Sequence, residues 1–460
     1  MLRYRYCALF VLLFSSNCVY SQVNDGIDTA AFDKKLTAAE RTFGLVQFWT
    51  EVKYNFAYFD QVPELDWDAS LKEYIPLVQN AENDVVYYRL MEQFCALLKN
   101  VNTKIFPPKR LVEKWDRPQL RIELIENAPV VVNRSKQVGN KVPLGARITS
   151  VNQVPLETHL EQNVFPYITA GGTQVERRWA AHDLMKGAAG SKVSFTFLSL
   201  DGKEGSATLV RSQKAKGIEW ELPSPERFLI NFEILENQVG LLTINSFADQ
   251  KIVEAFLEYL PEIKNCEKLV IDLRTNMSGN AVIAYDILKH FTDKPLLTTS
   301  WRTREHRSTN WALGKSLAEV DATTLNEQDR YNQQMYLGEV WHVVPADTIQ
   351  SALAPIPTMP IAVLMSNYTA AGAEKFLVSA DVLENFTFIG ESSFGDSAQL
   401  PMLSLPGGGS ARISTKRDTY PDGKVYIGPG ISVDVRVASS TKDYLEDRDV
   451  VLAKALEVLK

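Results

Sequence analysis

The sequence predicts an α+β chain of several domains, and three patterns along it support that prediction. Residues 28–110 place apolar side chains at helical spacing, which favours an N-terminal helical domain. Residues 118–212 hold short strand-like runs and an Asp-Gly turn signal at 201–202, which are typical of a small β-rich domain. From residue 218 to residue 460, apolar strands and helices alternate, which indicates β-α-β units around a largely parallel sheet.

The first 21 residues are typical of a secretory signal peptide. Arg3 and Arg5 form a positive start, residues 6–14 form an apolar core, and residues 19–21 are a plausible cleavage site. The apolar run is too short to span a bilayer comfortably, and no later segment is long and apolar enough to do so. We therefore expect an exported protein, periplasmic or secreted, without a stable membrane span.

Charge and composition narrow the classes of partner and cofactor. The formal net charge of −7 argues against nucleic acid as a partner. The five His residues show no metal-ligand spacing, so we expect no metal ion and no cofactor. Beyond the first 21 residues two cysteines remain, Cys95 and Cys266, in apolar surroundings and far apart in sequence. Two buried free thiols are the simpler interpretation, and a disulfide is the alternative.

The helical domain has clear start signals and a high density of aromatic residues. Asp68 is expected to cap a helix through Val78, and Asn83 or Asp84 to open another helix running to Lys99. The aromatic side chains either pack between helices or form a wall for a bound ligand, and their spacing does not separate these alternatives. They are Trp49, Tyr54, Phe56, Tyr58 and Phe59.

Residues 361–399 hold the pattern with the clearest chemical meaning. A buried strand at 361–365 leads through a turn of small residues at 366–374 into an apolar helix, and a second strand follows at 386–389. A tight turn at the start of a helix suits a nucleophile, because the first backbone N–H groups of the helix are free to bind an oxyanion.

Three short motifs resemble those of the C-terminal-processing (tail-specific) serine protease family. They are Thr-Ala-Ala-Gly-Ala-Glu at 369–374, Gly-Glu-Ser-Ser-Phe-Gly-Asp at 390–396 with a loose match at Gln399, and Asp-Leu-Arg-Thr-Asn-Met-Ser-Gly at 272–279. The aromatic segment at 48–68 is similar to the tricorn-core-like subgroup of that family. The resemblance implies a ClpP/crotonase-like β-α-β spiral core at 218–460. It also implies an oxyanion-type loop that involves Gly279 and Gly372.

The same resemblance implies that the catalytic positions are substituted. Ala371 occupies the position of the family's serine, and Asp396 occupies that of its lysine base. The tricorn-core-like subgroup uses a histidine base, and Asn102 stands in its place. A methyl group cannot attack a carbonyl, and an amide has no basic lone pair that takes a proton near neutral pH. The resemblance therefore implies a degenerate site with no intact catalytic residue.

Residues 144–153 are similar to the core motif of a PDZ domain, which implies that residues 118–212 form a PDZ-like domain. Gly145 and Ile148 are the motif positions expected at a peptide site, because such a domain binds an extended peptide as an added strand. The alternative is a structural spacer with a closed groove.

Residues 301–342 look irregular and are rich in aromatic and basic side chains, so we expect an insertion able to cover the active-site face. It is either a solvated basic loop or a patch that binds a carboxylate or another anion. The side chains concerned are Arg302, Arg304, His306, Arg307, Trp311, Trp341 and His342.

The substituted positions leave three functional hypotheses. The first is an exported pseudoprotease that binds peptide or unfolded protein tails without cutting them. The second is an active serine-type endopeptidase with a non-standard arrangement, in which Ser366 or Thr369, or a pair such as Ser414 and Lys416, takes over the chemistry. The third is a degenerate groove that binds a non-peptide ligand.

Overall fold

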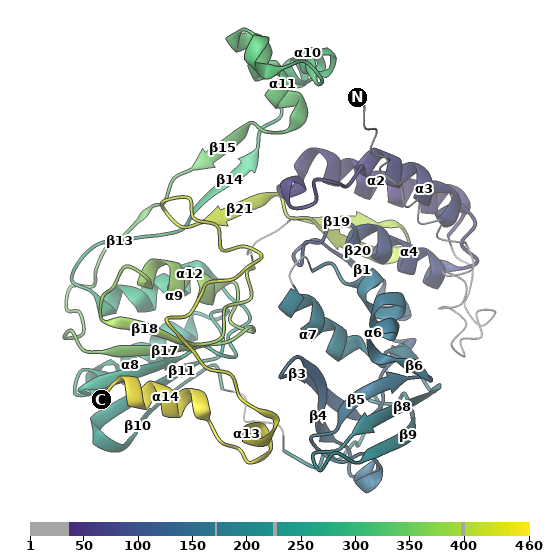
Figure 1. The fold of residues 1–460 in the computed structure, drawn as a ribbon. Helices are drawn as coiled ribbons and strands as arrows, with labels where there is room; N and C mark the ends of the chain where they lie inside the picture. The colour runs from purple at the N-terminus through teal and green to yellow at the C-terminus, as the bar shows by residue number, and fades with distance from the viewer. Residues whose placement is uncertain (1–35, 171–172, 224–227, 397–400) are drawn as a thin grey trace, which may run out of the picture.

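The computed structural model describes residues 36–170, 173–223, 228–396 and 401–460. Figure 1 shows three regions, namely an N-terminal helical region, a β domain below it and a larger sheet-and-helix core beside both. The expected signal peptide and Gln399 lie outside the described residues. Within the described ranges, no helix has the length and apolar character needed to cross a bilayer.

The N-terminal region is helical, as its spacing predicts. Its main helices are α2 (Ala38–Asn55), α3 (Trp67–Gln79) and α4 (Asp84–Ala96), followed by β1 (Lys104–Phe106), α5 (Lys109–Val112) and β2 (Trp115–Asp116). Buried aromatic and aliphatic side chains from all three main helices join the same hydrophobic core as the C-terminal half of the chain. The helical region therefore does not have a core of its own.

One of the predicted helix caps is confirmed and one is wrong. Asn83 caps α4, because its side-chain oxygen accepts hydrogen bonds from the N–H groups of Val85 and Val86 at 3.0 and 3.1 Å. Helix α3 is capped by Asp66, which accepts from the N–H of Ala69 at 2.9 Å. Asp68 lies inside α3 and pairs with a lysine instead. Two aspartates flank Trp67, and the sequence alone does not show which of them precedes the first turn.

The β domain is built on an antiparallel sheet with strand order β3-β4-β5-β8-β9 and a separate hydrophobic core. Helix α7 packs along β3, which is an edge strand of this sheet (Figure 1). The elements are β3 (Leu120–Ile125), β4 (Ala128–Arg134), β5 (Arg147–Val151), β6 (Val154–Pro155), α6 (Leu156–His159), α7 (Thr173–Asp183), β7 (Gly187–Ala188), β8 (Lys192–Leu198) and β9 (Glu204–Val210).

The core is a six-stranded sheet with the order β10-β11-β12-β17-β18-β22. Only β10 runs antiparallel to its neighbour, and the other pairs are parallel. The strands are β10 (Ile230–Ile234), β11 (Val239–Ile244), β12 (Lys268–Asp272), β17 (Ile361–Met365), β18 (Phe386–Gly390) and β22 (Val435–Arg436). The alternation of strands and helices in the sequence therefore predicts the class of this sheet correctly.

Both faces of the core sheet are covered, which explains why every residue of β17 and the three middle residues of β12 are apolar and buried. Helices α8, α9 and α12 lie on one face, and α14 lies on the other (Figure 1). Side chains of β17 alternate between the two cores, because Ile361 and Val363 join the first and Ala362 and Leu364 join the second. The helices are α8 (Lys251–Ile263), α9 (Ala281–Leu288), α12 (Gly372–Ala380), α13 (Thr441–Leu445) and α14 (Val450–Val458).

The insertion at 301–342 is regular rather than irregular. It forms a hairpin that pairs with a later strand in a three-stranded sheet, β15-β14-β21, and carries two helices at its tip (Figure 1). We call residues 300–344 the arm. Its elements are β14 (Ser300–Arg304), α10 (Ser308–Gly314), α11 (Glu327–Leu337) and β15 (Trp341–Val344), with β21 (Lys416–Thr419) as the third strand. A second small sheet, β1-β20-β19, joins the helical region to β19 (Met402–Leu405) and β20 (Gly409–Arg412).

Candidate active site

The turn between β17 and α12 has the geometry of a site for a nucleophile, although its key residue is an alanine. Ala371 is the N-cap of α12 and has φ 53° and ψ −112°. A residue with a side chain rarely has a positive φ, and such strain costs on the order of 1–3 kcal/mol. The backbone at Ala371 therefore keeps a strained turn that presents no reactive group.

The loop predicted to bind an oxyanion lies directly against this turn. A Cβ atom added to Gly372 would lie 3.1 Å from the carbonyl carbon of Gly279, so the two glycines are in close backbone contact. Gly279 has φ 130°, and a Cβ atom there would lie 2.2 Å from the carbonyl carbon of Phe247. Only glycine fits at that position. The structure thus brings Gly279 and Gly372 together, and their role as oxyanion-type donors stays a prediction.

Hydrogen bonds to Phe247 fix the position of the oxyanion-type loop. The N–H of Phe247 donates to the carbonyl of Ser278 at 3.0 Å, and the N–H of Asn280 donates to the carbonyl of Phe247 at 2.8 Å. Among the described residues, no backbone carbonyl accepts a hydrogen bond from the N–H of Gly279 or of Gly372. Both groups are therefore available to an oxygen atom of a bound peptide.

Glu374 connects the start of α12 to the motif at 390–396. Its buried carboxyl group accepts hydrogen bonds from the hydroxyl of Ser393 and from the N–H groups of Gly395 and Asp396, the latter two at 2.6 and 2.8 Å. Burial raises the pKa of Glu374 to about 8, and the nearby Asp396 charge also raises it. Sequence reasoning missed this anchoring role, although an acid at the start of an otherwise apolar helix was a signal for it.

A pocket of about 290 Å³ lies beside the turn, where all three regions meet. Ala370 and Asp396 line it from the core, Lys104 from β1 and Trp179 from α7. Asp396, which the resemblance assigns to the family's lysine position, thus lines the same pocket as Ala370, the residue before Ala371. The lining mixes charged and apolar side chains, which suits a peptide better than a purely apolar ligand.

Asn102, which the resemblance assigns to the histidine position, is fully buried. Within the described ranges, neither the oxygen nor the nitrogen of its side-chain amide has a hydrogen-bond partner. An unpaired buried polar group costs about 1–3 kcal/mol, so this amide is unfavourable for folding. Its neighbours Val101 and Lys104 line the pocket, which places the Asn102 segment next to the site as the resemblance implies.

The alternative nucleophiles are held by other groups. The hydroxyl of Ser366 donates to the carbonyl of Arg274 at 2.6 Å, and that of the buried Thr369 donates to the carbonyl of Leu273 at 2.9 Å. The hydroxyl of the buried Ser414 donates to the side chain of Asn100 at 2.7 Å. None of these acceptors is a basic group, so these hydrogen bonds do not activate the three hydroxyls.

The lysines near these candidates are also engaged. Lys375, four residues after Ala371, forms a buried ion pair with Asp418 at 2.8 Å, and its ammonium group donates to the hydroxyl of Tyr426 at 2.9 Å. Lys416 lies 3.4 Å from the same Asp418 carboxylate and does not pair with Ser414. Sequence reasoning missed this cluster because Asp418 comes from a strand far along the chain.

The predicted peptide-site residues of the β domain lie in its interior. Gly145 has φ 80° in the turn before β5, and Ile148 on β5 is only 2 % exposed and belongs to the domain core. Strand β5 is paired on both sides, with β4 and β8, so it has no free edge for a peptide. The role of Gly145 and Ile148 in peptide binding stays a prediction, and so does the PDZ-like character of the domain.

The remaining cysteines agree with the simpler of the two interpretations. Cys95 and Cys266 are both buried free thiols. Burial raises the pKa of the Cys95 thiol well above its usual range, so this group is not a reactive thiolate at neutral pH.

Comparison with known proteins identifies the core. Residues 238–437, which run from β11 to β22 and include the turn at Ala371, match the profile of Peptidase family S41. The chain is also 21% identical over 282 residues to the carboxy-terminal processing protease CtpB of Bacillus subtilis (strain 168). Residues 238–437 therefore form a Peptidase family S41 domain. The match with CtpB covers 59% of this chain and 50% of the relative, so the chain spans half the length of that protein.

Solved structures of low sequence identity share the fold over most of the chain. The crystal structure of mature CPAF has a TM-score of 0.68 with 13% identity, and the match covers 93% of this chain and 97% of that one. A putative peptidase from Parabacteroides merdae ATCC 43184 has a TM-score of 0.53 with 14% identity, and the match covers 92% and 97%. The similarity therefore extends beyond the family core to the helical region and the β domain.

Proposed function

We propose that this chain is an exported, catalytically degenerate member of the family that binds peptide or protein tails without cutting them. The observation that carries the proposal is Ala371, a residue without a nucleophile in the strained turn where the family has its serine. The oxyanion-type donors of Gly279 and Gly372 remain in place beside it. A site that keeps its peptide-binding groups and lacks the attacking atom is suited to binding rather than turnover.

The pocket beside Ala370 supports a peptide as the ligand. Lys104 lies on one side of it and Trp179 on another, with the ammonium 5.1 Å from the Trp179 ring centroid. A basic group next to an aromatic ring accommodates both a carboxylate and an apolar side chain, which a protein tail provides. Trp179 is on α7, so the β domain contributes directly to this binding site.

Hydrolysis of a fluorescently labelled unfolded casein tests the degenerate site. We expect no cleavage by the mature chain (residues 22–460), and cleavage by the double variant Ala371→Ser/Asn102→His, which restores a nucleophile and a base. Ala380→Ser, which adds the same hydroxyl at the far end of α12, is the matched control and stays silent. Cleavage by the unmodified chain contradicts the proposal and favours the active endopeptidase with a non-standard arrangement.

Binding of a fluorescein-labelled peptide with a free C-terminus, followed by anisotropy, tests the second half of the proposal. We expect saturable binding that Trp179→Ala weakens about tenfold, because the ring lines the pocket. Trp220→Ala is the control, since its ring packs on Arg121 and does not line that pocket. A silent chain that binds no peptide contradicts tail binding while leaving the degenerate site intact.

A further inference from the structure

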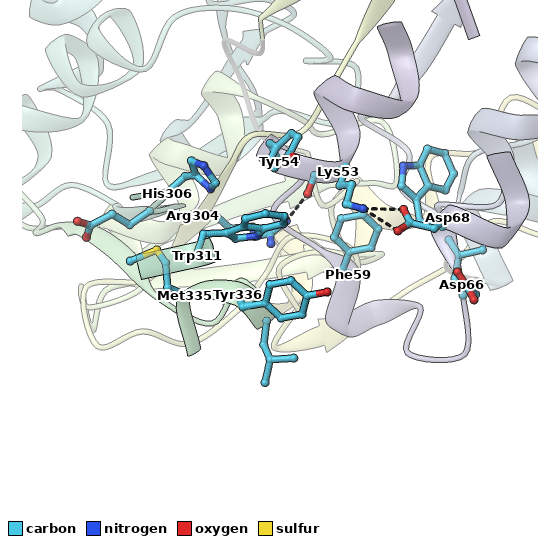
Figure 2. Close-up of a pocket in the computed structure, with 14 residues that line it drawn as sticks. Lys53, Tyr54, Phe59, Asp66, Asp68, Arg304, His306, Trp311, Met335 and Tyr336 are labelled. Carbon is cyan, nitrogen blue, oxygen red and sulfur yellow. Dashed lines mark hydrogen bonds and ion pairs between the residues drawn. The ribbon is translucent and has the colours of Figure 1, made fainter. Parts of the chain in front are cut away.

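A second pocket lies between the helical region and the arm, and no residue lines both it and the pocket beside Ala370. Its volume is about 420 Å³, within the usual range for small-molecule sites. The end of α2 and the start of α3 form one side, and β14, α10 and α11 form the other. Figure 2 shows aromatic side chains of both sides around the Arg304 side chain.

The walls of this pocket are aromatic. The rings of Tyr54, His306 and Trp311 contact one another with centroid distances of 5.3 to 6.1 Å. Tyr336 extends this wall, with its ring centroid 5.2 Å from that of Trp311. These rings come from α2, α10, α11 and the loop after β14, so the wall exists only when the arm packs on the helical region. Rings arranged in this way bind a flat apolar or aromatic group.

Two cationic side chains line this pocket, Lys53 and Arg304. Lys53 pairs with Asp68, whereas Arg304 has no carboxylate partner among the described residues. The Nη1 group of Arg304 donates to the carbonyls of Lys53 and Phe56 at 3.0 and 3.3 Å, at the end of α2. In the described part of the chain, no carboxylate lies within ion-pair distance of its guanidinium. Burial lowers the pKa of Arg304.

The acids of the same pocket are each already engaged. Asp68 pairs with Lys53 at 2.6 Å, and Glu305 pairs with Arg307 at 2.7 Å. Asp66 caps α3 through the N–H of Ala69. Arg304 itself lies 5.6 Å from the ring centroid of Phe59, beside an aromatic ring of the pocket. The lining therefore offers a ligand one guanidinium, that of Arg304, with which no described carboxylate pairs.

We propose that this pocket binds a carboxylate attached to an aromatic or bulky apolar group, with Arg304 as the anion partner and Trp311 and Tyr336 as the wall. A guanidinium binds a carboxylate through two parallel N–H groups, and a partly buried one gains most from such a partner. Two sources supply this chemistry, namely the C-terminal residue of a peptide and a free aromatic acid. The site is distinct from the degenerate one and does not depend on the function proposed for it.

Calorimetric titration with N-acetylphenylalanine and with its C-terminal amide tests the proposal. We expect saturable binding of the acid, and at least tenfold weaker binding of the amide, because only the acid supplies the anion. Titration with 3-phenylpropionate separates the sources. An affinity similar to that of N-acetylphenylalanine assigns the free acid, and at least tenfold weaker binding assigns the peptide terminus.

Two variants test whether Arg304 and Trp311 form the binding site, and a control variant on the same strand detects a general effect on folding. Arg304→Lys keeps the charge at the end of α2 but removes the two-pronged donor, and Trp311→Ala removes the wall; each is expected to weaken acid binding at least fivefold. Arg302→Gln is the matched control on the same strand, because its guanidinium stacks on Trp341, 4.6 Å from the ring centroid, outside the pocket. Equal affinity for acid and amide overturns the proposal, and so does acid binding that survives both variants or fails to saturate below about 10 mM.

Discussion

Ala371 and Glu374 lie one helical turn apart in the same motif, and they differ in what they retain. Ala371 keeps the strained backbone of a nucleophile site but has no functional group. Glu374 keeps its carboxyl group, buried and bound by three donors. The carboxyl group of Glu374 therefore supports the architecture of the turn, whereas the side chain of Ala371 makes no capping hydrogen bond there. An alanine at position 371 is compatible with the fold of the turn.

Of the substitutions that test this difference, removal of the Glu374 side chain should change the free energy of unfolding most. Glu374→Ala leaves the Ser393 hydroxyl and the N–H groups of Gly395 and Asp396 without their acceptor. We expect a loss of about 3 kcal/mol in the free energy of unfolding, measured by urea denaturation. Glu374→Gln keeps one acceptor and should lose about half as much. A loss below about 0.5 kcal/mol for Glu374→Ala would show that the anchor is not needed.

The pH dependence of stability should report on the same carboxyl group. Its pKa is raised to about 8 in the folded chain from an ordinary value of 4.5, so the folded state binds the proton more tightly. The stabilisation from this group is fully present below pH 4.5, its ordinary pKa. It is lost as the pH rises through about 8, its pKa in the folded chain. Relative to Glu374→Gln, the free energy of unfolding of the wild-type chain should fall by on the order of 1 kcal/mol per pH unit between these two pKa values. Parallel curves for the two chains would contradict the raised pKa.

Substitution at Asn102 should have a smaller effect of the opposite sign. Asn102→Leu replaces an unpaired buried amide with an apolar group of similar size, and we expect a gain of about 1 kcal/mol in the free energy of unfolding. Asn100→Leu is the matched control, because the Asn100 oxygen accepts from Thr103 and Ser414. The free energy of unfolding of Asn100→Leu should fall by about 2 kcal/mol. Destabilisation by both variants to the same extent would argue that the Asn102 amide is paired.

The smallest expected effect comes from the backbone strain at Ala371. Glycine adopts a positive φ without a Cβ clash, so Ala371→Gly should stabilise the chain by about 0.5–1 kcal/mol. Ala373→Gly, two residues further along inside α12, should instead destabilise it by about 1 kcal/mol, because glycine is unfavourable inside a helix. Thermal unfolding of the two variants measures this contrast. A loss of stability in both would show that the turn carries no strain to relieve.

Local patterns predicted the elements around the site well. The strand at 361–365, the turn of small residues and the apolar helix after it appear as β17, the turn at Ala371 and α12. Gly279 and Gly372 also come together as expected. These features follow from periodicity and from motif positions close together in the chain, which a sequence shows directly.

Features that depend on distant partners were not predictable in the same way. The arm looked irregular because β14 finds its second partner in β21, more than a hundred residues later. The buried pair of Lys375 with Asp418 was missed for the same reason. Ile148 satisfies a peptide-binding motif in sequence, yet it faces the interior of the β domain, and only the sheet order shows that β5 has no free edge.

The small sheet β1-β20-β19 has a consequence for how the chain folds. Lys104 in β1 pairs with Arg412 in β20, so two strands about 300 residues apart must meet before either the helical region or the C-terminal half is complete. Closing so long a loop is entropically costly and slow, and it leaves apolar helix faces uncovered in the meantime. During synthesis, the N-terminal helices emerge long before their partner strand, so the native contacts form only after nearly the whole polypeptide is available.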